Sequence, residues 1–81
     1  MANKLWDVKR VALRETLKEL RMNEGYTQDQ LADSLSKPQS YVSKYESGER
    51  KLDFVDVLEV IDVLGVELVT MYGVFNKKLQ P

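Results

Sequence analysis

Apolar residues along this chain recur at intervals of three and four positions, which is the spacing of one face of an α-helix. Leu13, Leu17 and Leu20 fall on one such stripe and predict a helix over about residues 7–23. Gly25 is well placed to end this helix, because the residue that follows a helix often adopts a positive φ. The first segment of the chain is therefore predicted to bury a leucine stripe.

Two shorter helices are predicted between residues 27 and 48. Thr27 is a good N-cap for a helix that ends at about Leu35. Its inward-facing residues are Leu31, Ala32 and Leu35. Pro38 has no N–H and a fixed φ, so it suits the first turn of the next helix, which we expect to run to about Ser47 before Gly48.

A fourth helix is predicted to open at Asp53, because Asp56 stands three residues later and the two resemble a capping box. Its apolar stripe is formed by Phe54, Val57, Leu58, Ile61 and Leu64. Gly65 ends it, residues 66–72 suffice for a short fifth helix, and residues 73–81 have no clear pattern. With no strand alternation, repeat or linker, we expect one all-α domain over residues 1–81. This compact five-helix bundle has its core at about residues 13–72 and a C-terminal tail at 73–81.

Composition excludes several functional classes. No apolar run approaches the roughly 20 residues that span a bilayer, and the N-terminal segment is too polar for a signal peptide, so we expect a cytoplasmic protein. The chain has no Cys and no His. Disulfides, thiolate zinc sites and imidazole bases are therefore absent, and its carboxylates are spread along helix surfaces. The sequence predicts a protein that is not an enzyme and that uses no metal or cofactor.

The net charge of −1 argues weakly against a nucleic-acid partner, but the charges are unevenly distributed. Residues 36–51 hold four basic and two acidic residues, a balance of +2, whereas residues 52–73 hold five acidic residues and no basic one, a balance of −5. This asymmetry predicts one basic face and one acidic face, although ordinary solvated helix faces are an equally good interpretation of charge alone.

Two short helices joined by a tight turn and set at a large angle are typical of a helix-turn-helix, whose second helix projects into a DNA major groove. The chain resembles the phage lambda Cro and cI type of helix-turn-helix proteins, also called the XRE family, over roughly residues 13–68. The matching residues are Thr27-Gln28, Leu31-Ala32, Leu35, Val42-Ser43, Tyr45-Glu46, Gly48, Arg50 and Leu64-Gly65-Val66. Two positions depart from the family: Ser36 replaces a turn glycine, and Pro38 replaces a Ser or Thr N-cap.

The third helix is the predicted reading helix. Val42 and Tyr45 should face the core, which leaves its other side polar. By resemblance, Gln39, Ser40 and Lys44 match the positions that read base edges. A glutamine can bond adenine through both amide atoms, and a lysine can donate to guanine acceptors. An ordinary polar face is the alternative interpretation.

Contacts with the DNA backbone are expected around the same helix. By resemblance, Gln28 at the start of the second helix supports a phosphate contact and braces the first residue of the reading helix. Tyr41 is predicted to touch a thymine methyl group or a phosphate, with a covering role for neighbouring side chains as the alternative. The other phosphate candidates are Lys37, Ser43, Arg50 and Lys51. For the three basic residues, a merely solvated charge remains an alternative.

Two further predictions concern structure. Arg21 and Glu46 match a family ion pair that ties the first helix to the third. At the C-terminal end, Met71, Tyr72 and Phe75 provide more apolar surface than a short helix and tail easily bury, which predicts a homodimer interface.

The leading hypothesis is a sequence-specific, repressor-like transcriptional regulator that binds double-stranded DNA. A homodimer would present two reading helices to a near-palindromic operator. One alternative is the antitoxin of a toxin–antitoxin pair, which would bind a protein toxin as well. Another is a protein-interaction module that keeps the fold without binding DNA.

Overall fold

The computed structural model describes residues 4–80 and consists of five helices without strands in that range. They are α1 (Lys4–Asn23), α2 (Gln28–Ser34), α3 (Ser40–Ser47), α4 (Phe54–Leu64) and α5 (Leu68–Lys78). The prediction of an all-α, five-helix fold is confirmed. Both ends of the predicted domain, at residues 1–3 and 81, lie outside the described residues.

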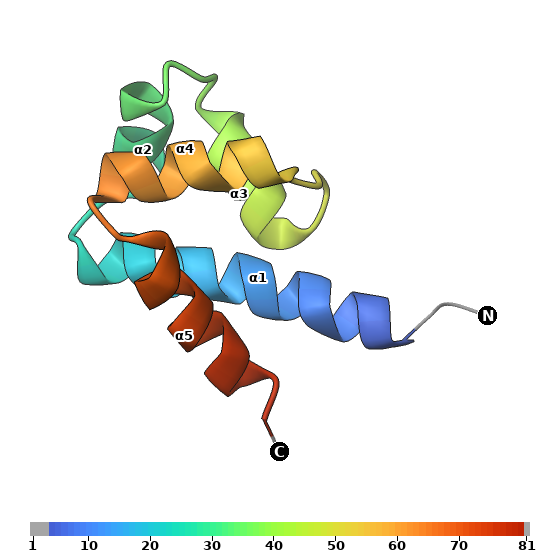
Figure 1. Ribbon diagram of the computed structural model, residues 1–81. Coiled ribbons are helices and arrows are strands. Elements are labelled where there is room, and N and C mark those ends of the chain that lie inside the picture. Colours follow the sequence, from blue (N-terminus) through green and yellow to red (C-terminus); the bar gives the residue numbers. More distant parts are fainter. Residues whose placement is uncertain (1–3, 81) are drawn as a thin grey trace.

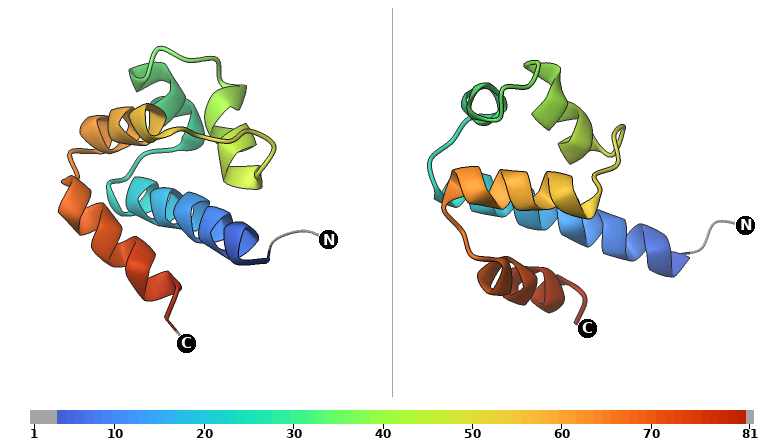
Figure 2. Two further views of the ribbon diagram at one scale, coloured as in Figure 1. Left: turned by 45° about the vertical axis from the view of Figure 1, so that its right-hand side comes forward. Right: turned by 45° about the horizontal axis from the view of Figure 1, so that its top comes forward.

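The long helix α1 lies between the other elements (Figure 1). α2 and α3 lie on one side of it, and α5 crosses it on the other side (Figure 2). α4 contacts α1, α2 and α5, so it joins the two halves of the bundle. None of the helices formed by residues 4–80 combines the length and the apolar character needed to cross a membrane.

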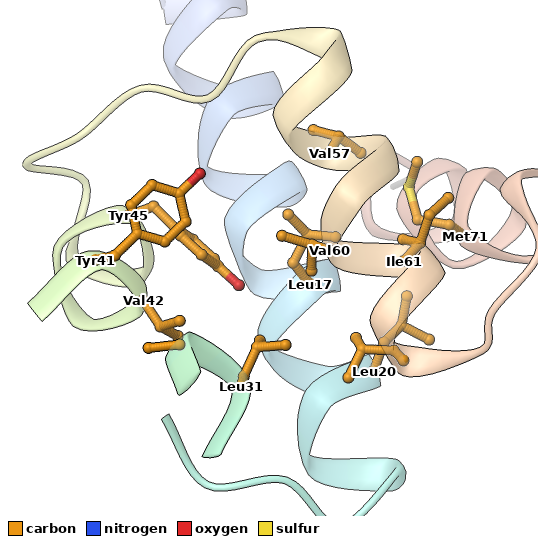
Figure 3. Packing of buried hydrophobic residues seen from close by; sticks show 12 residues of the cluster. Leu17, Leu20, Leu31, Tyr41, Val42, Tyr45, Val57, Val60, Ile61 and Met71 are labelled. Carbon is orange, nitrogen blue, oxygen red and sulfur yellow. The ribbon is translucent and has the colours of Figure 1, made fainter. Parts of the chain in front are cut away.

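A single hydrophobic core fills the space between these helices (Figure 3). Leu17 of α1, Leu31 of α2 and Val42 of α3 are fully buried in it. α4 contributes Val57, Val60, Ile61 and Leu64. The buried hydroxyl of Thr16 donates to the carbonyl oxygen of Ala12 at 2.7 Å, so this polar group inside α1 is satisfied.

The predicted N-caps of α2 and α4 are present. The Thr27 side chain accepts from the backbone N–H of Gln30, and the Gln30 side chain accepts from the N–H of Thr27, each at 3.0 Å. Asp53 and Asp56 form the same reciprocal pair at the start of α4. Both are capping boxes, which satisfy N–H groups that a helix start leaves without partners.

The structure differs from the expected boundaries at three helices. α1 begins at Lys4, three residues earlier than predicted. Pro38 stands just before α3 and not in its first turn, because α3 begins at Ser40. The expected fifth helix over residues 66–72 is instead α5, which begins at Leu68 and continues through most of the predicted tail to Lys78. In this helix Val74 and Phe75 pack against the core, and Lys78 binds Glu19 of α1 at 2.7 Å.

One predicted core residue lies outside the core. Phe54 is 61% exposed, whereas Val60, which the predicted stripe omitted, is fully buried. The reason is positional: Phe54 is the first residue of α4, and the buried face of this helix begins only at Val57.

Candidate nucleic-acid interface

The turn between α2 and α3 is closed by backbone hydrogen bonds. Leu35 N–H donates to the carbonyl oxygen of Leu31, and Lys37 N–H donates to that of Ala32, both at 3.0 Å. Between them Ser36 has a φ of 57°, in the left-handed region that favours glycine. A serine therefore adopts the left-handed conformation that a glycine usually adopts in such a turn. This local geometry sets the direction in which α3 leaves α2.

α3 is amphipathic despite its short length. Tyr41, Val42 and Tyr45 are buried, and Tyr41 and Tyr45 meet edge to face with ring centroids 5.6 Å apart. The predicted base-reading residues Gln39, Ser40 and Lys44 are all exposed. The second helix of the motif therefore offers hydrogen-bonding side chains on its outer face, while its inner face is held rigidly by the core.

The side chain of Gln39 is already held within the protein. Its Nε2 donates to Oδ2 of Asp29 in α2 at 2.9 Å. Gln28, which the resemblance assigned to bracing the start of the reading helix, donates instead to Glu46 Oε1 at 2.9 Å. The residue that braces Gln39 is therefore Asp29, and it leaves the Oε1 acceptor of Gln39 available to a base-edge donor. Sequence reasoning missed Asp29, because a carboxylate is not expected near phosphates.

Tyr41 does not occupy the surface position predicted for a DNA contact. Its side chain is only 5% exposed, and two cations cover its ring. The Lys37 Nζ lies 5.4 Å and the Arg50 Cζ 4.9 Å from the ring centroid, which are cation–π distances. Burial, with the nearby Asp56 and Glu59 carboxylates, raises the pKa of Tyr41, and Arg50 opposes this rise. Tyr41 is thus a platform for Lys37 and Arg50, in line with the alternative covering role.

The predicted ion pair between Arg21 and Glu46 is present and bidentate. Arg21 Nε donates to Glu46 Oε2 at 2.7 Å, and Nη2 donates to Oε1 at 3.1 Å. Arg21 Nη1 also donates to the carbonyl oxygen of Tyr26 at 2.7 Å. Because Gln28 binds the same carboxylate, Glu46 joins α1, α2 and α3 in one polar network. This network fixes the start of α2 relative to α3.

The phosphate candidates lie around α3. Lys37 precedes α3, and Arg50 and Lys51 follow it; all three are exposed. Ser43 is half-buried, and its hydroxyl donates to the carbonyl oxygen of Ser40 at 3.0 Å. Serines inside helices often form such a bond to the preceding turn. Gln28 is half-buried. The structure therefore brings Lys37 and Arg50 together at Tyr41, and it engages Gln28 and Ser43 in bonds within the protein.

Two cations from α1 also reach this region, and the sequence analysis missed them. Arg10 and Arg14 line a small cavity together with Arg50 and Lys51, beside Gly48. Their spacing of four residues places them on the same face of α1, which was the available signal.

The three residues predicted to form the homodimer interface differ in their exposure. Met71 is buried in the core of its own chain, so its side chain is not on the surface assigned to it. Tyr72 is exposed and Phe75 is half-buried, with their ring centroids 6.1 Å apart. Both line a groove of about 330 Å³ whose other apolar walls include Leu13, Leu52 and Phe54. Phe54, which was predicted to be buried, is exposed and therefore extends the apolar surface of α5.

The chain matches a known family in sequence and solved structures in fold. Residues 17–70 match the sequence profile of a helix-turn-helix family. A comparison with curated proteins gives no match. The crystal structure of the wild-type restriction-modification controller protein C.Esp1396I shares the fold. It superposes with a TM-score of 0.83 at 22% identity, covering 88% of this chain and 93% of that chain.

An XRE-family like protein from Pseudomonas syringae pv. tomato str. DC3000 is 32% identical, with a TM-score of 0.80. The match covers 96% of this chain and 94% of that chain. The family profile covers more than half of the chain and includes both helices of the motif. The chain therefore belongs to the XRE family of helix-turn-helix DNA-binding regulators.

Proposed function

We propose that this protein is a repressor-like transcriptional regulator that binds a specific, near-palindromic operator as a homodimer. It acts by occupying DNA, without a cofactor and without catalysing a reaction. The observation that carries the proposal is the outer face of α3, where Gln39, Ser40 and Lys44 are exposed above a fully packed inner face. A rigid helix with hydrogen-bonding side chains on its outer face is what reading of the major groove requires.

The residues in and around α3 fall into two groups, those that would contact bases and those that would contact phosphates. Gln39, Ser40 and Lys44 are the base-reading residues in this proposal, because amide, hydroxyl and ammonium groups can hydrogen-bond to the polar edges of the bases. Lys37, Arg50 and Lys51 lie just before and just after α3, and they would contact phosphates. Base contacts give sequence preference, whereas phosphate contacts give affinity for any duplex.

Dimerisation is the second part of the proposal. One reading helix touches only a few base pairs, so proteins with a single motif gain specificity by pairing across a two-fold axis. Tyr72, Phe75 and Phe54 line an apolar groove on this small domain, and Val69 of α5 is 73% exposed. Apolar surface of this kind on a small protein marks an interaction site.

The first experiment is the selection of bound duplexes from a random pool. Enrichment of one near-palindromic motif is the expected result. Lys44→Ala should then cost about 1–3 kcal/mol on the selected site and relax the preference at one base position. As a comparison, Lys51→Ala should weaken all sequences alike and reduce the salt slope by about one unit.

One outcome would contradict the proposal, and two others would change part of it. A pool that enriches no motif would exclude sequence-specific binding. An equal loss on every sequence for Lys44→Ala would remove this residue from the reading set. Purification from the native cell with a second polypeptide bound to the chain would favour the antitoxin alternative.

A further inference from the structure

We infer that Arg10 and Arg14 of α1 form, with Arg50 and Lys51 after α3, a binding site for one phosphate group of the DNA backbone. This inference rests on the proposed function, because the ligand is the backbone of the bound duplex. It adds the first helix to a contact surface that otherwise consists of α2, α3 and the segments that flank α3.

The site is a small cavity where α1 passes the end of α3. It measures about 70 Å³. Its charged walls are Arg10, Arg14, Arg50 and Lys51, and its other walls are Leu13, Tyr45, Gly48 and Leu52. The volume is about twice the roughly 30 Å³ that one molecule occupies in liquid water, so the cavity has room for a small oxyanion group.

Gly48 makes the approach of Arg14 possible. It is the C-cap of α3 with a φ of 91°, a conformation that other residues rarely adopt. A Cβ atom at this position would lie 3.0 Å from the Arg14 Cζ. The guanidinium of Arg14 therefore lies directly against the last turn of α3, beside the segment that carries Arg50 and Lys51.

Within the described residues, none of the four cations forms a salt bridge with a carboxylate. In the part of the chain that the structure describes, the salt bridges are Arg21 with Glu46 and Lys78 with Glu19. The C-terminal end of α3 offers only a partial negative charge to Arg14. Four cationic residues line this one cavity, although the Arg50 guanidinium also lies over the Tyr41 ring at 4.9 Å. Their positive charges repel one another, and an anion in the cavity would relieve that repulsion. Arginine favours phosphate in particular, because its planar fork binds two oxygens at once.

The position of the cavity suits a backbone phosphate. α3 has eight residues, which at 1.5 Å per residue gives a length of about 12 Å. Gln39 and Ser40 stand at the start of α3, so the end of the helix that carries the cavity lies about one helix length away from these base-reading residues, toward the phosphates that flank the groove. Arg10 and Arg14 reach that end from α1.

The test measures binding of a labelled duplex by fluorescence anisotropy between about 50 and 200 mM salt. The probes are the selected operator and an unrelated duplex of equal length. The variants are Arg10→Gln, Arg14→Gln and the double variant. Because Arg10 also lines the groove assigned to the homodimer interface, sedimentation of each variant verifies that its oligomeric state is that of the wild type. Lys77→Gln is the matched control, because it removes one charge from α5, which crosses α1 on the side away from α3 (Figure 1). Thermal melting of each variant verifies that the domain is folded.

The double variant should reduce the slope of log K against log salt by about one unit per bound chain, because the site holds one phosphate group, and each single variant should reduce it by part of that amount. The loss should be equal on both duplexes, and Lys77→Gln should leave the slope unchanged. A wild-type protein that binds neither duplex would overturn the proposed function together with this inference. A wild-type protein that binds while the arginine variants keep its slope would overturn the inference alone, even if Arg14→Gln lowers the melting temperature.

Discussion

At the scale of single residues, Tyr45 is a buried phenol whose hydroxyl has no hydrogen-bond partner within the described residues. A buried donor without a partner costs about 1–3 kcal/mol. We therefore predict that Tyr45→Phe, which keeps the ring and its contact with Tyr41, raises the free energy of unfolding by about 1 kcal/mol at neutral pH. Urea unfolding measures this change. Tyr26→Phe is the matched control and should destabilise, because the Tyr26 hydroxyl donates to the Val63 carbonyl oxygen.

The same residue has a second, pH-dependent signature. Burial raises the pKa of Tyr45 above its ordinary value of 10.0. Above pH 10.0 the unfolded chain loses this proton while the folded chain retains it, so the stability of the wild type should fall as the pH rises. Tyr45→Phe should lose less stability over that range. A loss of stability at neutral pH would show that the hydroxyl has a partner, and parallel pH profiles would show that burial does not raise the pKa of Tyr45.

Residue types in the sequence predicted some local geometry well and some poorly. The caps at Thr27 and Asp53 were predictable because capping depends on a few adjacent residues. The left-handed Ser36 was not predictable from its own preference, because serine rarely adopts a positive φ. The surrounding turn forces this conformation through the hydrogen bonds of Leu35 and Lys37. Tertiary geometry overrides local preference at this position.

At the scale of helices, Glu46 joins three of them, and its removal should be costly. The side chains of Arg21 and Glu46 are only 9% and 4% exposed. Loss of one partner leaves an unpaired buried charge, so Arg21→Ala and Glu46→Ala should each destabilise by about 3 kcal/mol. The double variant should lose less than the sum of the two single losses. Chemical denaturation of the four proteins measures this coupling.

The exposed pair Lys78 and Glu19 provides the comparison for that double-mutant cycle. Its N–O distance is also 2.7 Å, but both side chains are substantially exposed. Surface pairs contribute about 0–1 kcal/mol, so the cycle of Lys78→Ala and Glu19→Ala should be nearly additive. Additive losses at Arg21 and Glu46 as well would mean that their bidentate contact does not contribute to stability.

Helix positions were predicted better than helix ends. The repeats of Leu13, Leu17 and Leu20, or of Val57 and Ile61, identify buried faces because burial follows the 3.6-residue period. The length of α5 was underestimated, because Gly73 and the polar residues after Phe75 weaken the local signal. Packing of Val74 and Phe75 on the core and the contact of Lys78 with α1 extend this helix. Such long-range contacts are not visible in a local pattern.

At the scale of the whole molecule, the candidate site was only partly predictable. The outer face of α3 follows from helical periodicity once Val42 is placed inside. The bond between Gln39 and Asp29, and the approach of Arg14 to Gly48, join residues that are far apart in the sequence. These contacts depend on how α1, α2 and α3 are arranged in space. The basic segment 36–51 and the acidic segment 52–73 adjoin in the sequence, and Arg50 and Asp56, one from each, both act on Tyr41.

The last prediction concerns the assembly of two chains. Tyr72 is 58% exposed and Phe75 only half-buried, and both line the groove that we assign to the homodimer interface. Tyr72→Asp should dissociate the dimer while each chain stays folded, because this side chain contributes little to its own core. Phe75→Asp should dissociate it too, but at a cost in stability. Thr70→Asp, an exposed polar position on α5, is the control and should remain dimeric.

Sedimentation at micromolar concentration, with melting curves to verify folding, measures these effects. A dimer with two-fold symmetry would place its two α3 helices about 34 Å apart, one turn of DNA, so Tyr72→Asp should also lose most of its affinity for the two-half-site operator. Its affinity for a single half-site should stay close to that of the wild type, because α3 and its contacts are intact. A wild-type protein that remains monomeric both free and on its operator would exclude this assembly. The apolar groove formed by Phe54, Tyr72 and Phe75 would then need a different partner.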